Sequence, residues 1–177
     1  MTLGRLGLIA AAATLAGCAT NQPSPYPQQR PPARYRAPAT PAVSPATYVA
    51  QASSIDLFVI RSSQLALSRS GSGAVRDLAR RLVAAHEGTA SQLSFAGRRL
   101  DLLPSAALLP QHQAMLDELQ SSSNFDATYL RQQRAIHGAS FSLHSNFAAR
   151  GTSPTLRPVA ANAAAVERSH LDMLRRL

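Results

Sequence analysis

After residue 46, apolar residues recur along the chain at spacings of three and four. This spacing places them on one face of an α-helix. The pattern predicts long helices at about 45–70, 73–97, 124–149 and 155–177, with a short helix at 110–119 that links the second long helix to the third. No alternating strand pattern competes with it, so the sequence predicts an all-α domain.

Local start and stop signals support these bounds. Ser44 before Pro45, Ser72, and Ser153 before Pro154 are typical of helix beginnings, while Gly71 and Gly151 interrupt the pattern. Four long helices in a domain of this size favour an up-down-up-down four-helix bundle over residues 47–177.

The first residues differ in character. One arginine, Arg5, precedes an apolar run of about ten residues, which is too short to span a membrane but typical of a secretory signal peptide at residues 1–17. Leu15-Ala16-Gly17-Cys18 resembles the lipobox of bacterial lipoproteins. Cys18 is the one cysteine in the chain and is the predicted site of lipidation, for example by palmitate.

Residues 18–46 form the second segment. Eight of the twelve prolines lie here, and no apolar periodicity is present. Such a composition cannot build a core and favours an extended polyproline II linker. We therefore expect a lipid-anchored linker that carries the helical domain. Ala19 after the cysteine favours an outer-membrane lipoprotein that faces the periplasm of a Gram-negative bacterium.

Three segments carry a family resemblance: LALSRSGSGAVRDLARRLVAAH, FDATYLRQQRAIH and ERSHLDM. They resemble the ferritin-like family of bacterial exported proteins called domain of unknown function 4142. The matching points include the opening of the third long helix, with Phe125, Asp126 and Tyr129. The resemblance implies a four-helix bundle in the cell envelope and brings no established activity.

Three histidines occupy similar positions on three predicted helices. His86, His137 and His170 each lie about 20 Å from the start of their helix, at 1.5 Å per residue. In an antiparallel bundle, residues near the middle of each helix share one layer. Asp56 lies at a similar height on the first helix. We expect these four residues to form either a zinc or copper site or a polar cluster in the core.

Other metal and catalytic motifs are incomplete. Glu167 and His170 have the spacing of half a di-iron ligand set, but no second such pair exists, so no di-iron centre is expected. His86-Glu87 lacks the second histidine of a zinc-protease helix. No nucleophile elbow or phosphate-binding loop occurs, so no motif in the chain indicates a particular reaction, and whether the protein is an enzyme stays open.

The chain is basic, with a formal net charge of +9. Arginine pairs could contact anionic lipids or other anionic polymers of the envelope, whereas an exported protein meets little nucleic acid, so no nucleic-acid partner is expected. The sequence favours a structural or interaction role, or a stress-protective one, for a lipid-anchored bundle. The alternative is a periplasmic protein that binds or buffers metal through core histidines.

Overall fold

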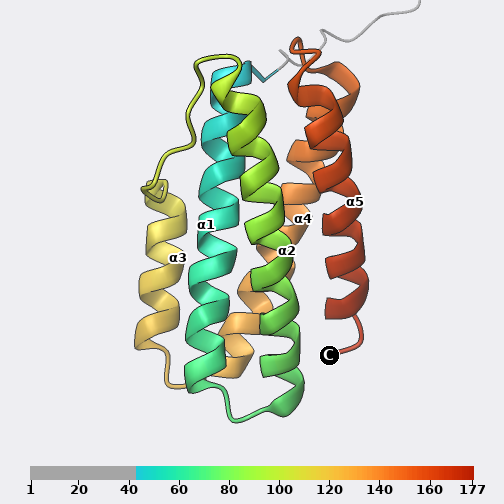
Figure 1. Ribbon diagram of the computed structural model, residues 1–177. Coiled ribbons are helices and arrows are strands. Elements are labelled where there is room, and N and C mark those ends of the chain that lie inside the picture. Colours follow the sequence, from blue (N-terminus) through green and yellow to red (C-terminus); the bar gives the residue numbers. More distant parts are fainter. Residues whose placement is uncertain (1–42) are drawn as a thin grey trace, which may run out of the picture. The chain divides into compact units, whose positions relative to one another are not determined.

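The computed structural model describes residues 43–177, and these residues form five α-helices and no strands (Figure 1). The predicted all-α class is therefore confirmed for this part of the chain. The helices are α1 (Pro45–Arg69), α2 (Gly73–Arg98), α3 (Pro110–Ser121), α4 (Phe125–Arg150) and α5 (Leu156–Leu174).

The N-terminal predictions fall on other residues. The signal peptide, Cys18 and nearly all of the linker lie outside the described residues. The first helix begins slightly before the predicted domain start at residue 47. Within residues 43–177, no helix has both the length and the apolar character needed to cross a membrane.

The helix starts follow from local chemistry. The Ser44 side chain accepts a hydrogen bond from the backbone N–H of Thr47, and Pro45 occupies the first turn of α1. Ser72 caps α2 in the same way, through the N–H of Val75. These side chains satisfy backbone donors that have no partner inside the helix.

Each long helix has two long neighbours. α1 packs against α2 and α4, and α5 packs against the same two helices. Tyr48 contacts His144 while Ser63 contacts Tyr129, so residue numbers rise along α1 as they fall along α4. α1 and α4 are therefore antiparallel.

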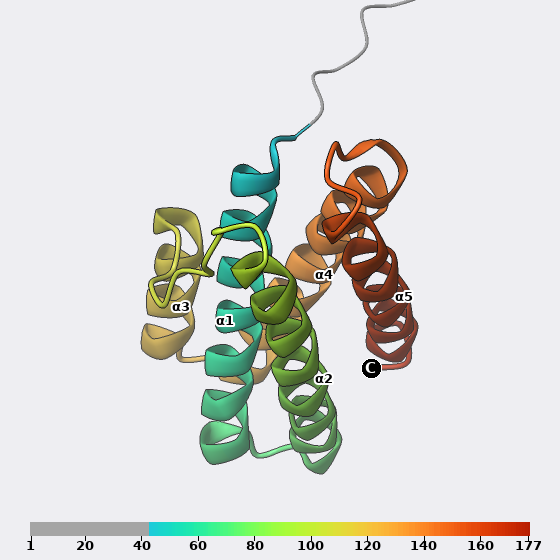
Figure 2. The ribbon, with the colours of Figure 1, turned by 45° about the horizontal axis from the view of Figure 1, so that its top comes forward.

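The predicted order of helix directions is different from the one in the structure. Both α2 and α4 run antiparallel to α1, so these two helices run in the same direction rather than in an up-down-up-down sequence (Figures 1 and 2). The reason is α3, which packs against α1 and α4 and returns the chain to the end where α2 began. The sequence predicted this helix but treated it as a link.

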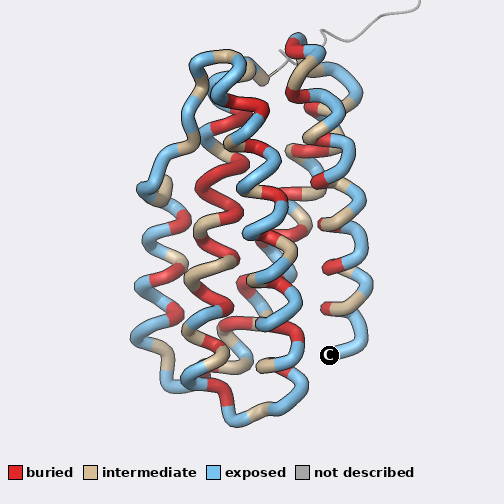
Figure 3. The backbone as a smooth tube through the Cα atoms, viewed as in Figure 1, coloured by how far each residue is buried: buried red, intermediate tan, exposed pale blue. Residues whose placement is uncertain are grey.

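The buried apolar residues form two separate clusters. One includes Phe58, Leu82 and Tyr129, and the other includes Tyr48 and Phe147. Figure 3 shows the buried positions along the facing sides of the long helices. Between these apolar clusters, at the level of Asp56 and His137, lies a layer of buried polar side chains.

A candidate metal centre in the core

Three histidine rings meet in this polar layer. The ring centre of His86 on α2 lies 5.3 Å from that of His137 on α4 and 5.2 Å from that of His170 on α5. The His137 and His170 centres are 5.0 Å apart. The three mid-helix positions thus fall in one layer, as the spacing along each helix led us to expect.

A carboxylate joins the three rings. Glu167 lies on α5 three residues before His170, so both side chains occupy the same face of that helix. Its two oxygens are 4.0 Å from Nε2 of His86 and 3.9 Å from Nδ1 of His137.

The four side chains present a compact donor set. One ligand atom from each of His86, His137, Glu167 and His170 lies within 4.8 Å of all the others. In a tetrahedral site with metal–nitrogen bonds of about 2.0–2.1 Å, ligand atoms are roughly 3.4 Å apart. Small side-chain rotations would therefore bring this set around one ion. All four residues are buried.

Asp56 lies behind His86 rather than among the four. Its Oδ1 atom is 2.8 Å from Nδ1 of His86 and accepts a second hydrogen bond, also 2.8 Å, from the Thr89 hydroxyl. A carboxylate accepts hydrogen bonds, so Nδ1 carries the proton and Nε2 of His86 faces the other three side chains. This arrangement is common behind histidines that bind metals, because it fixes the ring and its tautomer.

Ser140 has a similar role for Glu167. Its hydroxyl donates a 2.7 Å hydrogen bond to Oε1, which leaves Oε2 without a hydrogen-bond partner among the described residues. Burial raises the pKa of Glu167 to about 7, against the opposing effects of His86 and Ser140. A nearby cation would favour the charged form of this group.

The imidazoles differ in their affinity for protons. Burial and the neighbouring His86 lower the pKa of His170 to about 3. Burial, His86 and His170 hold the pKa of His137 well below its ordinary value. Burial alone would lower the pKa of His86, but the hydrogen bond with Asp56 and the charges of Glu167 and Asp56 raise it. Near neutral pH, His137 and His170 are therefore neutral and can donate lone pairs.

Most unpartnered buried side-chain atoms of the described residues lie in this cluster; the others are single oxygens of Asp126, Gln132 and Gln133. Five of its atoms make no hydrogen bond to any described residue: Nε2 of His86, both ring nitrogens of His137, Oε2 of Glu167 and Nδ1 of His170. An unpartnered buried polar atom costs about 1–3 kcal/mol. A bound cation among these nitrogen and oxygen atoms would give several of them a partner.

The remaining buried histidines are separate and have partners. Nδ1 of His144 lies 2.9 Å from the hydroxyl of Tyr48, and Nδ1 of His112 lies 2.7 Å from that of Ser54. Neither histidine belongs to the four-residue set. Each therefore serves as a polar residue of the core.

The family-motif residues lie away from the cluster. The hydroxyl of Tyr129 forms a hydrogen bond with the hydroxyl of Ser63. The guanidinium of Arg69 lies 4.8 Å from the ring centre of Phe125. Asp126 is in the first turn of α4, where a carboxylate interacts favourably with the helix dipole. These three residues contribute to the fold around the start of α4.

Glu167 was not among the site residues expected from the sequence. The chain has no second Glu-x-x-His pair, so the sequence predicted no di-iron centre. The Glu167-x-x-His170 spacing was the available signal, since it puts both residues on one helix face beside the predicted histidine layer. The position directly before His86 holds Ala85 and offers no acidic partner, so the partner of His86 comes from elsewhere in the chain. It is Asp56, which comes from a different helix.

Solved structures resemble this fold. CopM in the Cu(II)-bound form is 17% identical over 74% of this chain and 93% of its own, with a TM-score of 0.63. CopM in the apo form has a TM-score of 0.61 at 16% identity, over 74% of this chain and 93% of its own. A DUF305 fragment from Deinococcus radiodurans is 18% identical over 77% of this chain and 100% of its own, with a TM-score of 0.63. At such identities, the likeness shows a shared helical fold.

Family membership rests on the sequence. No curated protein matches the chain significantly. The profile of the family described as Domain of unknown function (DUF4142) matches residues 30–177, which include all five helices. The chain therefore belongs to the DUF4142 family, whose resemblance was visible in its histidine-bearing segments.

Proposed function

We propose that this chain is a metal-binding protein that holds one copper(II) or zinc ion at His86, His137, Glu167 and His170. The scaffold would be a ferritin-like four-helix bundle made by α1, α2, α4 and α5. The unpartnered polar atoms of the four side chains carry this proposal. One cation at their centre would satisfy several of them at once.

A purely structural cluster fits the structural role that the sequence favoured, with metal binding as its alternative. A core that uses histidines only for packing pairs their nitrogens with hydrogen-bonding partners, as His112 and His144 do here. Five atoms of the four-residue set lack such pairs, including both ring nitrogens of His137. The difference between the two groups of buried histidines favours a ligand at the four-residue set.

The donor atoms favour particular ions. Three imidazoles and one carboxylate suit copper(II) and zinc, and copper(II) binds such ligands more tightly. No cysteine lies among residues 43–177, and the four-residue set offers only nitrogen and oxygen ligand atoms. Copper(I) and silver(I), which prefer sulfur ligands, would bind less well. The likeness to CopM, whose structures include a Cu(II)-bound form, adds support for copper.

Binding would change the protonation of the site. Glu167 would stay ionised beside the cation, and His86 would donate a lone pair from Nε2 while Nδ1 keeps its hydrogen bond to Asp56. Because the pKa of His86 is raised, metal binding at moderately acidic pH would release a proton from this ring. The protein would then bind or buffer metal.

The proposed location is the envelope. The lipobox-like segment Leu15–Cys18 supports a lipid anchor in the outer membrane, with the helical domain on the periplasmic side. A metal-buffering protein in this cellular location would reduce the free concentration of a metal ion that enters the periplasm.

The test measures metal content in protein purified without a histidine tag. After incubation with Cu(II) or Zn(II) and removal of excess ion, the unmodified chain should retain about one ion per molecule, the number that a single four-ligand site holds. His137→Gln should lose it. His144→Gln is the matched control, because it changes another buried histidine outside the donor set. Equal retention by the two variants, or no retention by the unmodified chain, would overturn the proposal.

A further inference from the structure

One end of the helical domain differs from the other in its surface chemistry. Here α1 and α5 begin and α2 and α4 end, at the top of Figure 1. Tyr48, Phe147 and Leu156 pack together beneath it in one apolar cluster. We call this the entry end, because the 42 residues that precede Val43 join the domain there.

Exposed apolar side chains gather at the entry end. Two of the three exposed large hydrophobic residues among residues 43–177 lie here, Phe95 at 63% exposed and Leu103 at 72%, whereas Leu177, at 46%, lies at the opposite end. Phe95 lies in the last turn of α2, and Leu103 follows in a loop whose backbone lies against Gly97. Exposed aromatic and aliphatic side chains near one another are typical of surfaces that insert into a membrane interface.

Positive charge surrounds these side chains. The segments 95–104 and 148–159 carry four arginines and one acidic residue, Asp101. The arginines are Arg98, Arg99, Arg150 and Arg157. Arg98 and Arg157 donate to neutral acceptors, the Ser94 hydroxyl at 3.0 Å and the Ala148 carbonyl at 2.8 Å. These guanidinium charges are therefore not neutralised by carboxylates.

The opposite end of the domain has mixed charge. Arg175 pairs with Asp172 there, and Arg131 pairs with Glu118 at 2.6 Å. Both ion pairs cancel positive charge close to the surface. Other arginines of that end, Arg69, Arg76 and Arg134, donate to backbone carbonyls and keep their charge. The entry end differs in that its arginines lie beside two exposed large apolar side chains.

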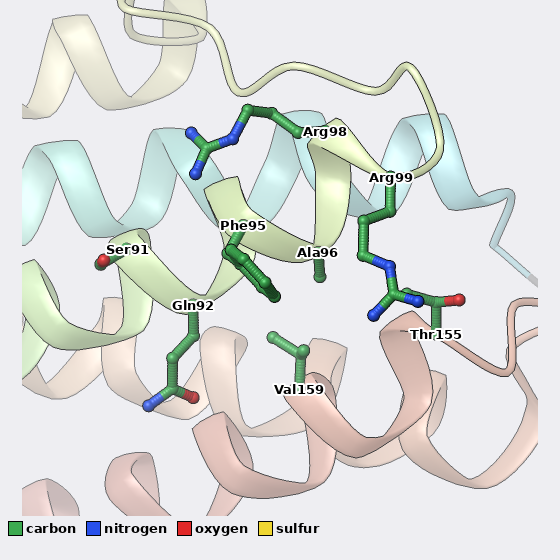
Figure 4. A pocket seen from close by; sticks show the side chains of 8 residues that line it. All are labelled: Ser91, Gln92, Phe95, Ala96, Arg98, Arg99, Thr155 and Val159. Atoms are coloured by element: carbon green, nitrogen blue, oxygen red, sulfur yellow. The ribbon is translucent and has the colours of Figure 1, made fainter.

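A pocket of about 510 Å³ lies between the end of α2 and the start of α5. Figure 4 shows the Phe95 ring facing Val159, with Arg99 reaching over the pocket toward Thr155. The pocket therefore combines an apolar floor with a guanidinium and a hydroxyl at its edge. A phosphate headgroup with an attached acyl chain has the complementary chemistry.

We infer that the entry end is a membrane-docking surface for anionic phospholipids, in which Phe95 and Leu103 insert among the lipids while Arg98 and Arg99 bind headgroup phosphates. Docking at this end would lay the starts of α1 and α5 against the membrane. The opposite end, where α1 turns into α2, would face away from the membrane.

The absence of tryptophan from the chain allows a direct test. The background is the chain from residue 19 onward, which contains every described residue but neither the apolar N-terminal run nor Cys18. Phe95→Trp introduces one fluorescent reporter at the entry end, and Leu177→Trp introduces one at the opposite end. With phosphatidylglycerol-containing vesicles, the emission of the Phe95→Trp variant should shift to shorter wavelength, while the emission of the Leu177→Trp variant stays unchanged. A shift in both variants, or in neither, would overturn the inference.

Charge variants identify the lipid contacts. Arg98→Ala/Arg99→Ala should weaken vesicle binding about 30-fold, which corresponds to about 1 kcal/mol for each arginine near the surface. Arg175→Ala/Arg176→Ala removes the same charge at the opposite end and should change binding less than about threefold. Equal losses in the two double variants would contradict a specific docking end. Inorganic phosphate at millimolar concentration should not compete; full competition would instead indicate a site for the free anion.

Discussion

Asp56 is the residue on which the geometry of His86 depends. Its Oδ1 atom accepts hydrogen bonds from both His86 and Thr89. Without Asp56, the His86 ring could rotate or change its tautomer. Mutation of a residue in such a position typically weakens metal affinity tenfold to a hundredfold, although the residue is not itself a ligand.

This role leads to a prediction for Asp56→Ala. The variant should still bind about one copper ion, but about tenfold to a hundredfold more weakly than the unmodified chain, as measured by competition with a chelator of known affinity. Asp77→Ala, at an exposed aspartate, is the control and should have no effect. Complete loss of the ion would mean that Asp56 is itself a ligand, and unchanged affinity would remove it from the site.

His144 provides a pH prediction. Burial lowers its pKa in the folded protein to about 4, from an ordinary value of 6.5, with smaller effects of Asp56 and His86. Between these two values the unfolded chain binds the proton and the folded chain does not, so stability falls as the pH falls from 6.5 toward 4. The full effect is on the order of 3 kcal/mol.

The test compares His144→Gln with the unmodified chain, both free of metal. Glutamine can still bond to Tyr48 but does not titrate, so the free energy of unfolding of the variant should improve relative to the unmodified chain as the pH is lowered from 7 to 4. Urea unfolding at a series of pH values gives this difference. A difference that stays constant with pH would show that His144 is not a source of acid sensitivity.

At the scale of residues, the heights of the three histidines along the bundle were predictable, because each height depends on one helix alone. Counting residues along a helix gives its height, and three similar heights give a layer. The partners of those histidines were not predictable in the same way. Asp56 reaches His86 from α1, and Ser140 of α4 reaches Glu167 of α5, so both contacts depend on how the helices are rotated against one another.

At the scale of elements, the end of α2 depends on a glycine. A Cβ atom added to Gly97 would lie 2.2 Å from the backbone oxygen of Leu102, because the chain folds back onto this last turn. Backbone cannot move aside as easily as a flexible side chain. Gly88 lies in the same helix with no atom within 4 Å of such a Cβ.

These two glycines form a matched pair for a stability test. Gly97→Ala should destabilise the fold by more than about 1 kcal/mol, since the substitution forces the loop after α2 to shift. Gly88→Ala should stabilise it by about 0.5–1 kcal/mol, because alanine favours the helix. Thermal or urea unfolding measures both. A similar effect of the two substitutions would contradict the close packing at Gly97.

Helix bounds were largely predictable, whereas helix directions were not. Ser44, Ser72 and the glycines act within a few residues, so the sequence alone locates the starts and ends. The direction of α4 depends on whether the preceding segment crosses the domain. That segment contains α3, whose Leu116 and Leu119 pack into the core beside α1 and α4, and this docking is a tertiary contact.

For the whole molecule, the first prediction concerns its attachment to the membrane. Cys18 should carry the lipid, so cells that express the unmodified chain should incorporate labelled palmitate into it, and cells that express Cys18→Ser should not. Fractionation should place the labelled protein in the outer membrane. Equal labelling of the two proteins would show that Cys18 is not the attachment site.

The proposed metal site is the central claim, and a structure of the copper-loaded protein tests it most directly. Diffraction data on both sides of the copper absorption edge locate the ion without reference to the protein coordinates. We predict one anomalous peak about 2.0–2.2 Å from nitrogen atoms of His86, His137 and His170 and from an oxygen of Glu167. A peak elsewhere, or loaded crystals with no peak among these four side chains, would contradict the account.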